Sequence, residues 1–130
     1  MLEPILRPAI QSVSPGFMIL MVITLLLVFL LIVLTESVVL QLLGWGDTRA
    51  VWKAAIKLNA VSAILTSPLL GMARQWGEGS IWIAWAISII IEGFILLRMK
   101  PNALLQNVLC AFLANTASTL ILILPSFRFA

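Results

Sequence analysis

The stretch from Phe17 to Leu43 reads FMILMVITLLLVFLLIVLTESVVLQLL, and it decides the fold class of this chain. Glu36 is the only charged residue in it, and the run exceeds the roughly 20 apolar residues that cross a bilayer as a helix. The apolar core of a secretory signal peptide is shorter, about 7–15 residues. The stretch therefore predicts a transmembrane helix rather than a cleaved leader.

The rest of the chain repeats this apolar character. Of its 130 residues 62% are hydrophobic and 10% are charged, whereas a soluble domain is about half apolar and a quarter charged. Three further apolar stretches, at 49–70, 80–97 and 103–124, are separated by a turn at 44–48, a polar loop at 71–79 and a second turn at 98–102. We therefore expect an all-α integral membrane protein with four transmembrane helices.

The two halves of the chain carry the same polar pattern. Each half has a Glu, an Asn 23 residues further along and a Ser three residues after the Asn. The pattern comprises Glu36, Asn59 and Ser62 in the first half, and Glu92, Asn115 and Ser118 in the second. Because each copy contains two helices, the copies are expected to be parallel repeats related by an axis along the membrane normal. The fold prediction is therefore two tandem helical hairpins.

This repeat divides the chain into five parts. We expect an interfacial N-terminal segment (1–16), hairpin repeat 1 (17–70), a connecting loop (71–79), hairpin repeat 2 (80–124) and a C-terminal exit (125–130). The first segment contains Pro4, Pro8 and Pro15, which interrupt any helix long enough to span.

The distribution of basic residues predicts the orientation. The hairpin turns and their flanks carry five of the eight Lys and Arg, namely Arg49, Lys53, Lys57, Arg98 and Lys100. Cytoplasmic loops carry the excess of basic residues, so the turns are expected in the cytoplasm and both termini on the opposite side. The location expected is a bacterial inner membrane or another energy-coupling membrane.

The six patterned residues are expected to form one polar layer. Glu36 lies about 10 Å below the end of its helix and Asn59 about 15 Å below the start of the next, at 1.5 Å per residue. On antiparallel helices these depths are close, so a carboxyl-to-amide hydrogen bond is predicted within each hairpin. Ser62 and Ser118 follow about one helical turn deeper on the same faces.

Two interpretations of the layer remain open. In the first, each Glu–Asn pair holds helices together through hydrogen bonds worth about 0.6 to 2 kcal/mol each. In the second, the two carboxyl groups repel in a low dielectric, share a proton and form a proton or cation site. The first is favoured, because each Glu has its own partner and no third acidic residue or His extends a pathway. Lys57 is a secondary candidate partner for Glu36, but Leu113 occupies the matching position in the second half, which favours a snorkelling lysine.

Other residue types limit the chemistry. The chain has no His and a single cysteine, Cys110, and it shows neither a metal-ligand cluster nor a Gly-rich phosphate loop. We therefore expect no enzymatic activity, no cofactor and no metal. No basic surface with interleaved aromatic residues points to nucleic acid. Five tryptophans near the turns are typical of a membrane-interface belt, with stacking on a lipid, quinone or pigment as the alternative.

The chain shows no resemblance that names a family, so function is inferred from class alone. The leading hypothesis is a non-catalytic accessory or scaffold subunit of a larger membrane protein complex. Its partners would be other integral membrane subunits and lipid, with a homo-oligomer as a variant. The first alternative is a small transporter or channel that moves protons or cations through Glu36 and Glu92. The second alternative is a lipid, quinone or pigment binder.

Overall fold

A computed structural model describes residues 14–128 of the chain, and this part is all-helical. The expected interfacial segment at 1–16 lies almost entirely outside the described residues. The long helices are α1 (Pro15–Leu42), α2 (Thr48–Gly71), α4 (Gly79–Met99) and a composite last helix. That last helix consists of α5 (Leu104–Ser118), the π-helical segment η1 (Thr119–Ile123) and α6 (Leu124–Arg128). Four helices are long and apolar enough to cross a membrane, as expected.

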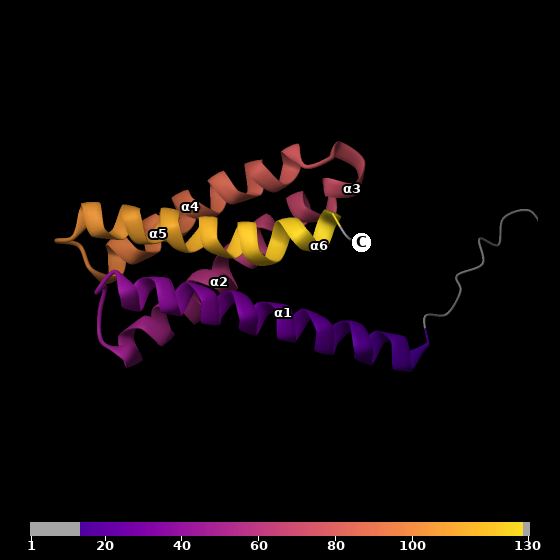
Figure 1. Ribbon diagram of the computed structural model, residues 1–130, viewed down its shortest axis with the longest axis horizontal. Coiled ribbons are helices and arrows are strands. Elements are labelled where there is room, and N and C mark those ends of the chain that lie inside the picture. The colour runs from indigo at the N-terminus through magenta and orange to yellow at the C-terminus, as the bar shows by residue number, and fades with distance from the viewer. Residues whose placement is uncertain (1–13, 129–130) are drawn as a thin grey trace, which may run out of the picture.

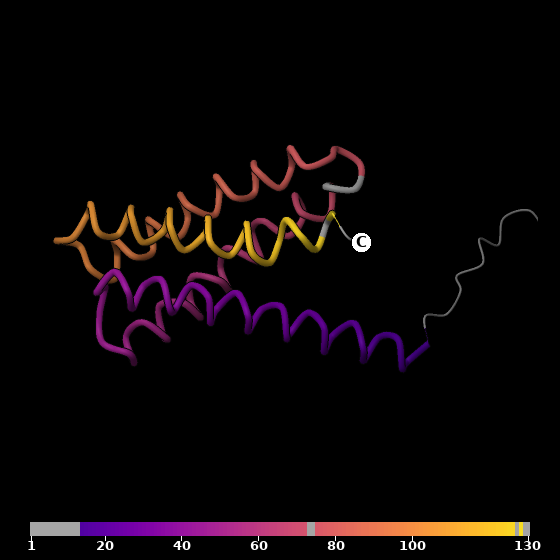
Figure 2. The backbone as a smooth tube through the Cα atoms, in the orientation of Figure 1, coloured from indigo at the N-terminus to yellow at the C-terminus, as the bar shows by residue number. Residues whose placement is uncertain are grey.

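The four long helices pack in a ring. α1 contacts α2, α2 contacts α4, α4 contacts α5, and α5 returns to α1 (Figure 1). Both hairpin turns lie at one end of the bundle, called here the turn end, and α3 (Ala73–Trp76) and α6 lie at the other, the loop end (Figure 2). The N-terminal half of α1 diverges from the other helices towards the loop end (Figure 1). The ring therefore closes most tightly at the turn end.

Local sequence explains where the first hairpin turns. Gly44 adopts a positive φ of 62°, a conformation open to glycine without strain. Its N–H donates to Gln41 O, and the N–H of Trp45 donates to Leu40 O, both at 3.0 Å. This is the Schellman arrangement that ends a helix by satisfying its last carbonyls. Asp47 then starts α2 by accepting a hydrogen bond from Ala50 N at 2.7 Å.

Small residues bring the helices together at the turn end. Ala54 and Ala55 of α2 and Ala111 of α5 are fully or almost fully buried. A methyl group at Gly93 of α4 would lie 3.7 Å from Cβ of Ala111, which is ordinary contact. Where lipid removes the hydrophobic drive between helices, such close approach supplies the packing energy. The larger apolar core cluster therefore includes Leu40, Ala55 and Ala111, and a smaller cluster around Ile81 and Leu124 lies towards the loop end.

The structure differs from the sequence expectation at the loop end. The connection at 71–79 contains the short helix α3, and the last helix continues to Arg128 instead of ending at Leu124. α2 contains Pro68 and ends at Gly71, one residue beyond the expected stretch. Pro68 lacks the N–H that would bond Ile64 O, and the Ser67 hydroxyl donates to that carbonyl at 3.3 Å instead. A backbone without water must keep its polar groups bonded, so helix persists through the proline.

Candidate functional site

The centre of the bundle holds the two glutamates, each bonded to the asparagine of its own hairpin. The amide nitrogen of Asn59 donates to Glu36 Oε2 at 2.5 Å, and that of Asn115 donates to Glu92 Oε2 at 2.5 Å. Each asparagine also donates to a carbonyl one turn back in its own helix, Ala55 O at 2.9 Å and Ala111 O at 3.0 Å, respectively. The expected carboxyl-to-amide contact is therefore present in both hairpins, with the same secondary bond.

The serines connect one hairpin to the other. Ser118 Oγ of α5 donates to Glu36 Oε1 of α1 at 2.9 Å. Ser62 of α2 lies beside the Glu92 carboxyl of α4, without a hydrogen bond of comparable geometry. The three-residue spacing predicted each serine to lie one turn deeper than the asparagine of its own hairpin. In the structure, the carboxyl group nearest to each serine belongs to the other hairpin. The layer therefore joins neighbouring helices all round the ring.

All six residues of this polar layer are at most 5% exposed, yet they enclose space. A cavity of about 80 Å³ is lined by all of them, together with Thr66 and Ser88 on the loop-end side. Thr66 and Ser88 also line a smaller adjoining cavity of about 30 Å³, which extends to Thr119 and Trp85. A water molecule needs about 10–15 Å³ of such volume and two to four polar partners. The larger cavity has room and partners for more than one water.

The layer contains two acids and no base. Lys57 is exposed on α2, and the structure does not bring it to Glu36. Among the side chains that the structure describes, which leave out those at 73, 74 and 127, the one ion pair is Arg128–Glu78 at the loop end, outside the four spans. Arg128 Nε lies 2.9 Å from Glu78 Oε1, and its hydrogen bond lowers the pKa of that carboxyl from its ordinary value. The carboxyl pair is therefore held by neutral donors alone, which suits protonated or proton-sharing acids.

A second polar cluster, which the sequence did not reveal, joins the two hairpin turns. Trp45 of the first turn is 5% exposed, and its indole N–H donates to Asn107 Oδ1 of α5 at 2.8 Å. Lys100 Nζ of the second turn donates to Trp45 O at 3.0 Å and to Gln106 Oε1 at 2.9 Å. Gln106 Nε2 then donates to Leu43 O and to the next carbonyl, both at 3.1 Å. We call these four residues, Trp45, Lys100, Gln106 and Asn107, the turn clasp.

The turn clasp corrects one expectation about the tryptophans. Trp45 was expected in an interface belt, but it is buried because its indole N–H has a protein acceptor in Asn107. Trp52, Trp76 and Trp82 are exposed. Trp85 is partly buried, donates to Thr116 Oγ1 at 3.2 Å and meets Trp82 edge to face, with 5.9 Å between the ring centroids.

No family model matches the chain, and neither a curated protein nor a solved structure is significantly similar to it.

Proposed function

We propose that this protein is a non-catalytic accessory or scaffold subunit of a larger membrane protein complex, built from two parallel hairpin repeats. The exposure of α1 carries the proposal. Only 6% of the most apolar window of α1 is buried within the protein, against 33% for each of the other three spans. Along Phe17–Leu27 the side chains are exposed on every face of the helix. Such a helix offers a long apolar surface on which a neighbouring membrane subunit can pack.

The polar layer fits this role as internal glue. Each carboxyl group accepts a hydrogen bond from an amide of its own hairpin. Glu36 also accepts the Ser118 hydroxyl of the other hairpin, so both of its oxygens are bonded. In lipid, hydrogen bonds of this kind contribute about 0.6 to 2 kcal/mol each to helix association. Neutral acids in satisfied pairs stabilise the bundle without performing chemistry.

Purification in mild detergent after crosslinking in the membrane tests the proposal. The wild-type chain is expected to retain other integral membrane subunits, identified by mass spectrometry. Leu20→Ala with Leu27→Ala on α1 should reduce their recovery. The control is Leu104→Ala with Leu105→Ala on α5, whose side chains are at least as exposed (62% and 72%, against 61% and 56%). A chain recovered only as a monomer, or equal loss in both variants, would overturn the scaffold role.

A second candidate, proton or cation transport through Glu36 and Glu92, is favoured by the cavity that both carboxyls line. Thr66, Ser88 and Thr119 continue its polar lining towards the loop end. Glu36 accepts hydrogen bonds on both oxygens, whereas Glu92 Oε1 accepts none of good geometry.

Charge separates the two candidates. Glu36→Gln with Glu92→Gln keeps the shape of the layer but removes the titrating groups. As a scaffold, this variant should retain its partner chains. As a transporter, it should fold but lose the flux seen with wild type in vesicles under a pH or cation gradient. Glu78→Gln, which removes a carboxyl outside the layer, is the control and should leave any flux unchanged.

The proposed orientation, turns in the cytoplasm and termini outside, has its own test. Asn102 is exposed in the second turn and Gln75 is exposed in the connection. In a Cys110→Ala background, a cysteine replacing Asn102 should react with a membrane-impermeant thiol reagent only from the cytoplasm. A cysteine replacing Gln75 should react only from the other side, and labelling of both from one side would refute the four-span arrangement.

A further inference from the structure

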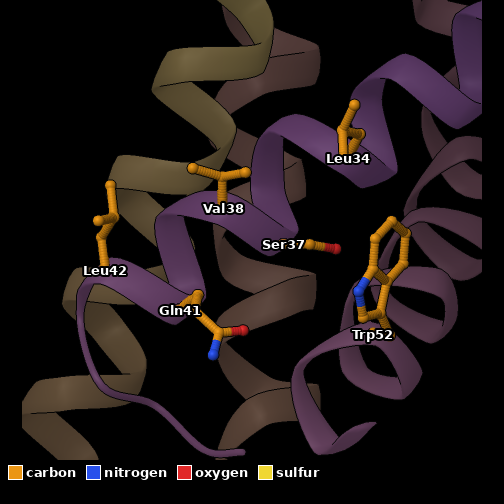
Figure 3. A pocket seen from close by; sticks show the side chains of 6 residues that line it. All are labelled: Leu34, Ser37, Val38, Gln41, Leu42 and Trp52. Atoms are coloured by element: carbon orange, nitrogen blue, oxygen red, sulfur yellow. The ribbon is translucent and has the colours of Figure 1, made fainter. Parts of the chain in front are cut away.

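The outer surface of the first hairpin contains an open groove near the turn end. It has a volume of about 170 Å³ and is lined by Leu34, Ser37, Val38, Gln41 and Leu42 of α1 and Trp52 of α2 (Figure 3). Its three aliphatic side chains lie four residues apart, so they form one stripe along α1. A drug-sized ligand needs about 300–1,000 Å³, whereas a cavity of about 150 Å³ holds benzene. The groove therefore suits a length of one acyl chain and is too small for a pigment or quinone ring system with its substituents.

One polar donor in this groove has no partner. The indole N–H of Trp52 makes no hydrogen bond with any of the described residues, and Trp52 is 39% exposed. In Figure 3 the nitrogen-bearing edge of its ring faces α1, on the side of Ser37. Ser37 Oγ already donates to Val33 O at 2.6 Å, and Gln41 Nε2 donates to Thr48 Oγ1 at 3.2 Å. The Trp52 indole N–H and the second hydrogen of Gln41 Nε2 are therefore the donors that remain at the groove, and an ester carbonyl of a lipid is a matching acceptor for the indole.

Positive charge gathers next to the groove. Arg49, Lys53 and Lys57 lie at four-residue steps on α2, and all three side chains are exposed. They form no ion pair with any acid in the part of the chain that the structure describes. Asp47, the acid nearest in sequence, accepts the hydrogen bond that caps α2. With three cations against the one acid Asp47, the first half of α2 carries a net positive charge on the helix that supplies Trp52 to the groove, and such charge attracts anionic headgroups.

We propose that this groove binds one anionic phospholipid of the surrounding bilayer. One acyl chain lies along Leu34 and Val38, an ester carbonyl accepts the Trp52 indole N–H, and the phosphate contacts Arg49 and Lys53. The site is separate from the carboxyl layer and does not depend on the scaffold role. It narrows the lipid, quinone or pigment alternative to a lipid.

Fluorescence quenching by brominated lipids tests the site, with the Trp52 contribution measured as the difference between wild type and Trp52→Phe. The protein is reconstituted in mixed phosphatidylcholine and phosphatidylglycerol vesicles in which only one of the two lipids is brominated, at equal mole fraction. Brominated phosphatidylglycerol should quench Trp52 more strongly than brominated phosphatidylcholine. Trp82 at the loop end, also 39% exposed, is the matched control and should show no such preference. Equal quenching of Trp52 by both lipids, or quenching by neither, would overturn the proposal.

Two variants separate the contributions of charge and shape. Arg49→Gln with Lys53→Gln should lower the relative affinity for the anionic lipid by about fivefold for each charge removed. Val38→Phe partly fills the groove and should weaken quenching of Trp52 by both lipids while leaving Trp82 unchanged. A preference that survives loss of both cations would refute the assigned phosphate contacts. Undiminished quenching in the Val38 variant would refute the position of the chain.

Discussion

The two asparagines of the polar layer make matching bonds, yet their replacement should have unequal effects. Asn59→Leu and Asn115→Leu each remove one bond of 2.5 Å to a buried carboxyl group. Glu36 then keeps the Ser118 hydroxyl as a donor at 2.9 Å, whereas Glu92 keeps only the neighbouring Ser62 hydroxyl, which makes no hydrogen bond of comparable geometry. The structure therefore predicts that the second hairpin is the more sensitive to loss of its asparagine.

The magnitudes follow from two contributions. A lost interhelical hydrogen bond costs about 0.6–1.7 kcal/mol in lipid, and a buried acceptor left unsatisfied costs about 1–3 kcal/mol. Asn115→Leu combines both, so we expect a loss of about 3 kcal/mol in the free energy of unfolding. Asn59→Leu leaves the Ser118 hydrogen bond to Glu36 in place. The loss in the free energy of unfolding should therefore be smaller by the value of one hydrogen bond in lipid, ~1 kcal/mol.

Reversible unfolding in mixed micelles, titrated with a denaturing detergent, measures both values. Ser118→Ala is the control, because it removes the donor that makes the two sites unequal. In that background the two asparagine substitutions should cost the same. The reasoning is refuted if Asn59→Leu costs as much as Asn115→Leu in the wild-type chain, or if a difference persists without the serine hydroxyl.

Two further predictions concern the ends of the bundle. Asn107→Leu removes the acceptor of the buried Trp45 indole, so it should destabilise the protein by about 1–3 kcal/mol and increase the solvent accessibility of Trp45, measured by acrylamide quenching. At the loop end, Arg128 lowers the pKa of Glu78 from its ordinary value of 4.5, so the pair's stabilisation is present above pH 4.5 and is lost as pH falls through the lowered pKa. Melting temperatures measured against pH should therefore differ between wild type and Glu78→Gln only above that window, and only slightly, because both side chains are exposed.

Hydropathy and spacing predicted the parts of this structure that depend on one helix or one hairpin. The apolar run around Glu36 identified a spanning helix because lipid admits few other backbone conformations. The equal Glu–Asn spacing identified the contact within each hairpin, since depth along antiparallel helices can be counted from the turn.

Contacts between hairpins were not predictable in this way. Trp45 and Asn107 are 62 residues apart in the chain, and neither residue type indicates that the other will be its hydrogen-bond partner. The face of Ser118 was predicted, but a face does not determine which of two carboxyls its hydroxyl meets. The π-helical segment Thr119–Ile123 was not predicted either, and both of its end residues line the smaller cavity.

The length of α1 has a consequence for the membrane itself. Its 28 residues extend about 42 Å, whereas a typical hydrocarbon core is about 30 Å thick. The 21 residues of α4 extend about 32 Å and match such a core almost upright. A helix that is longer than the hydrocarbon core fits it by tilting away from the membrane normal. The tilt of α1 away from the other helices therefore reduces the mismatch between its length and the thickness of the membrane. Bilayer thickness should therefore set the angle between α1 and the other three helices, and a thicker membrane should draw α1 towards them.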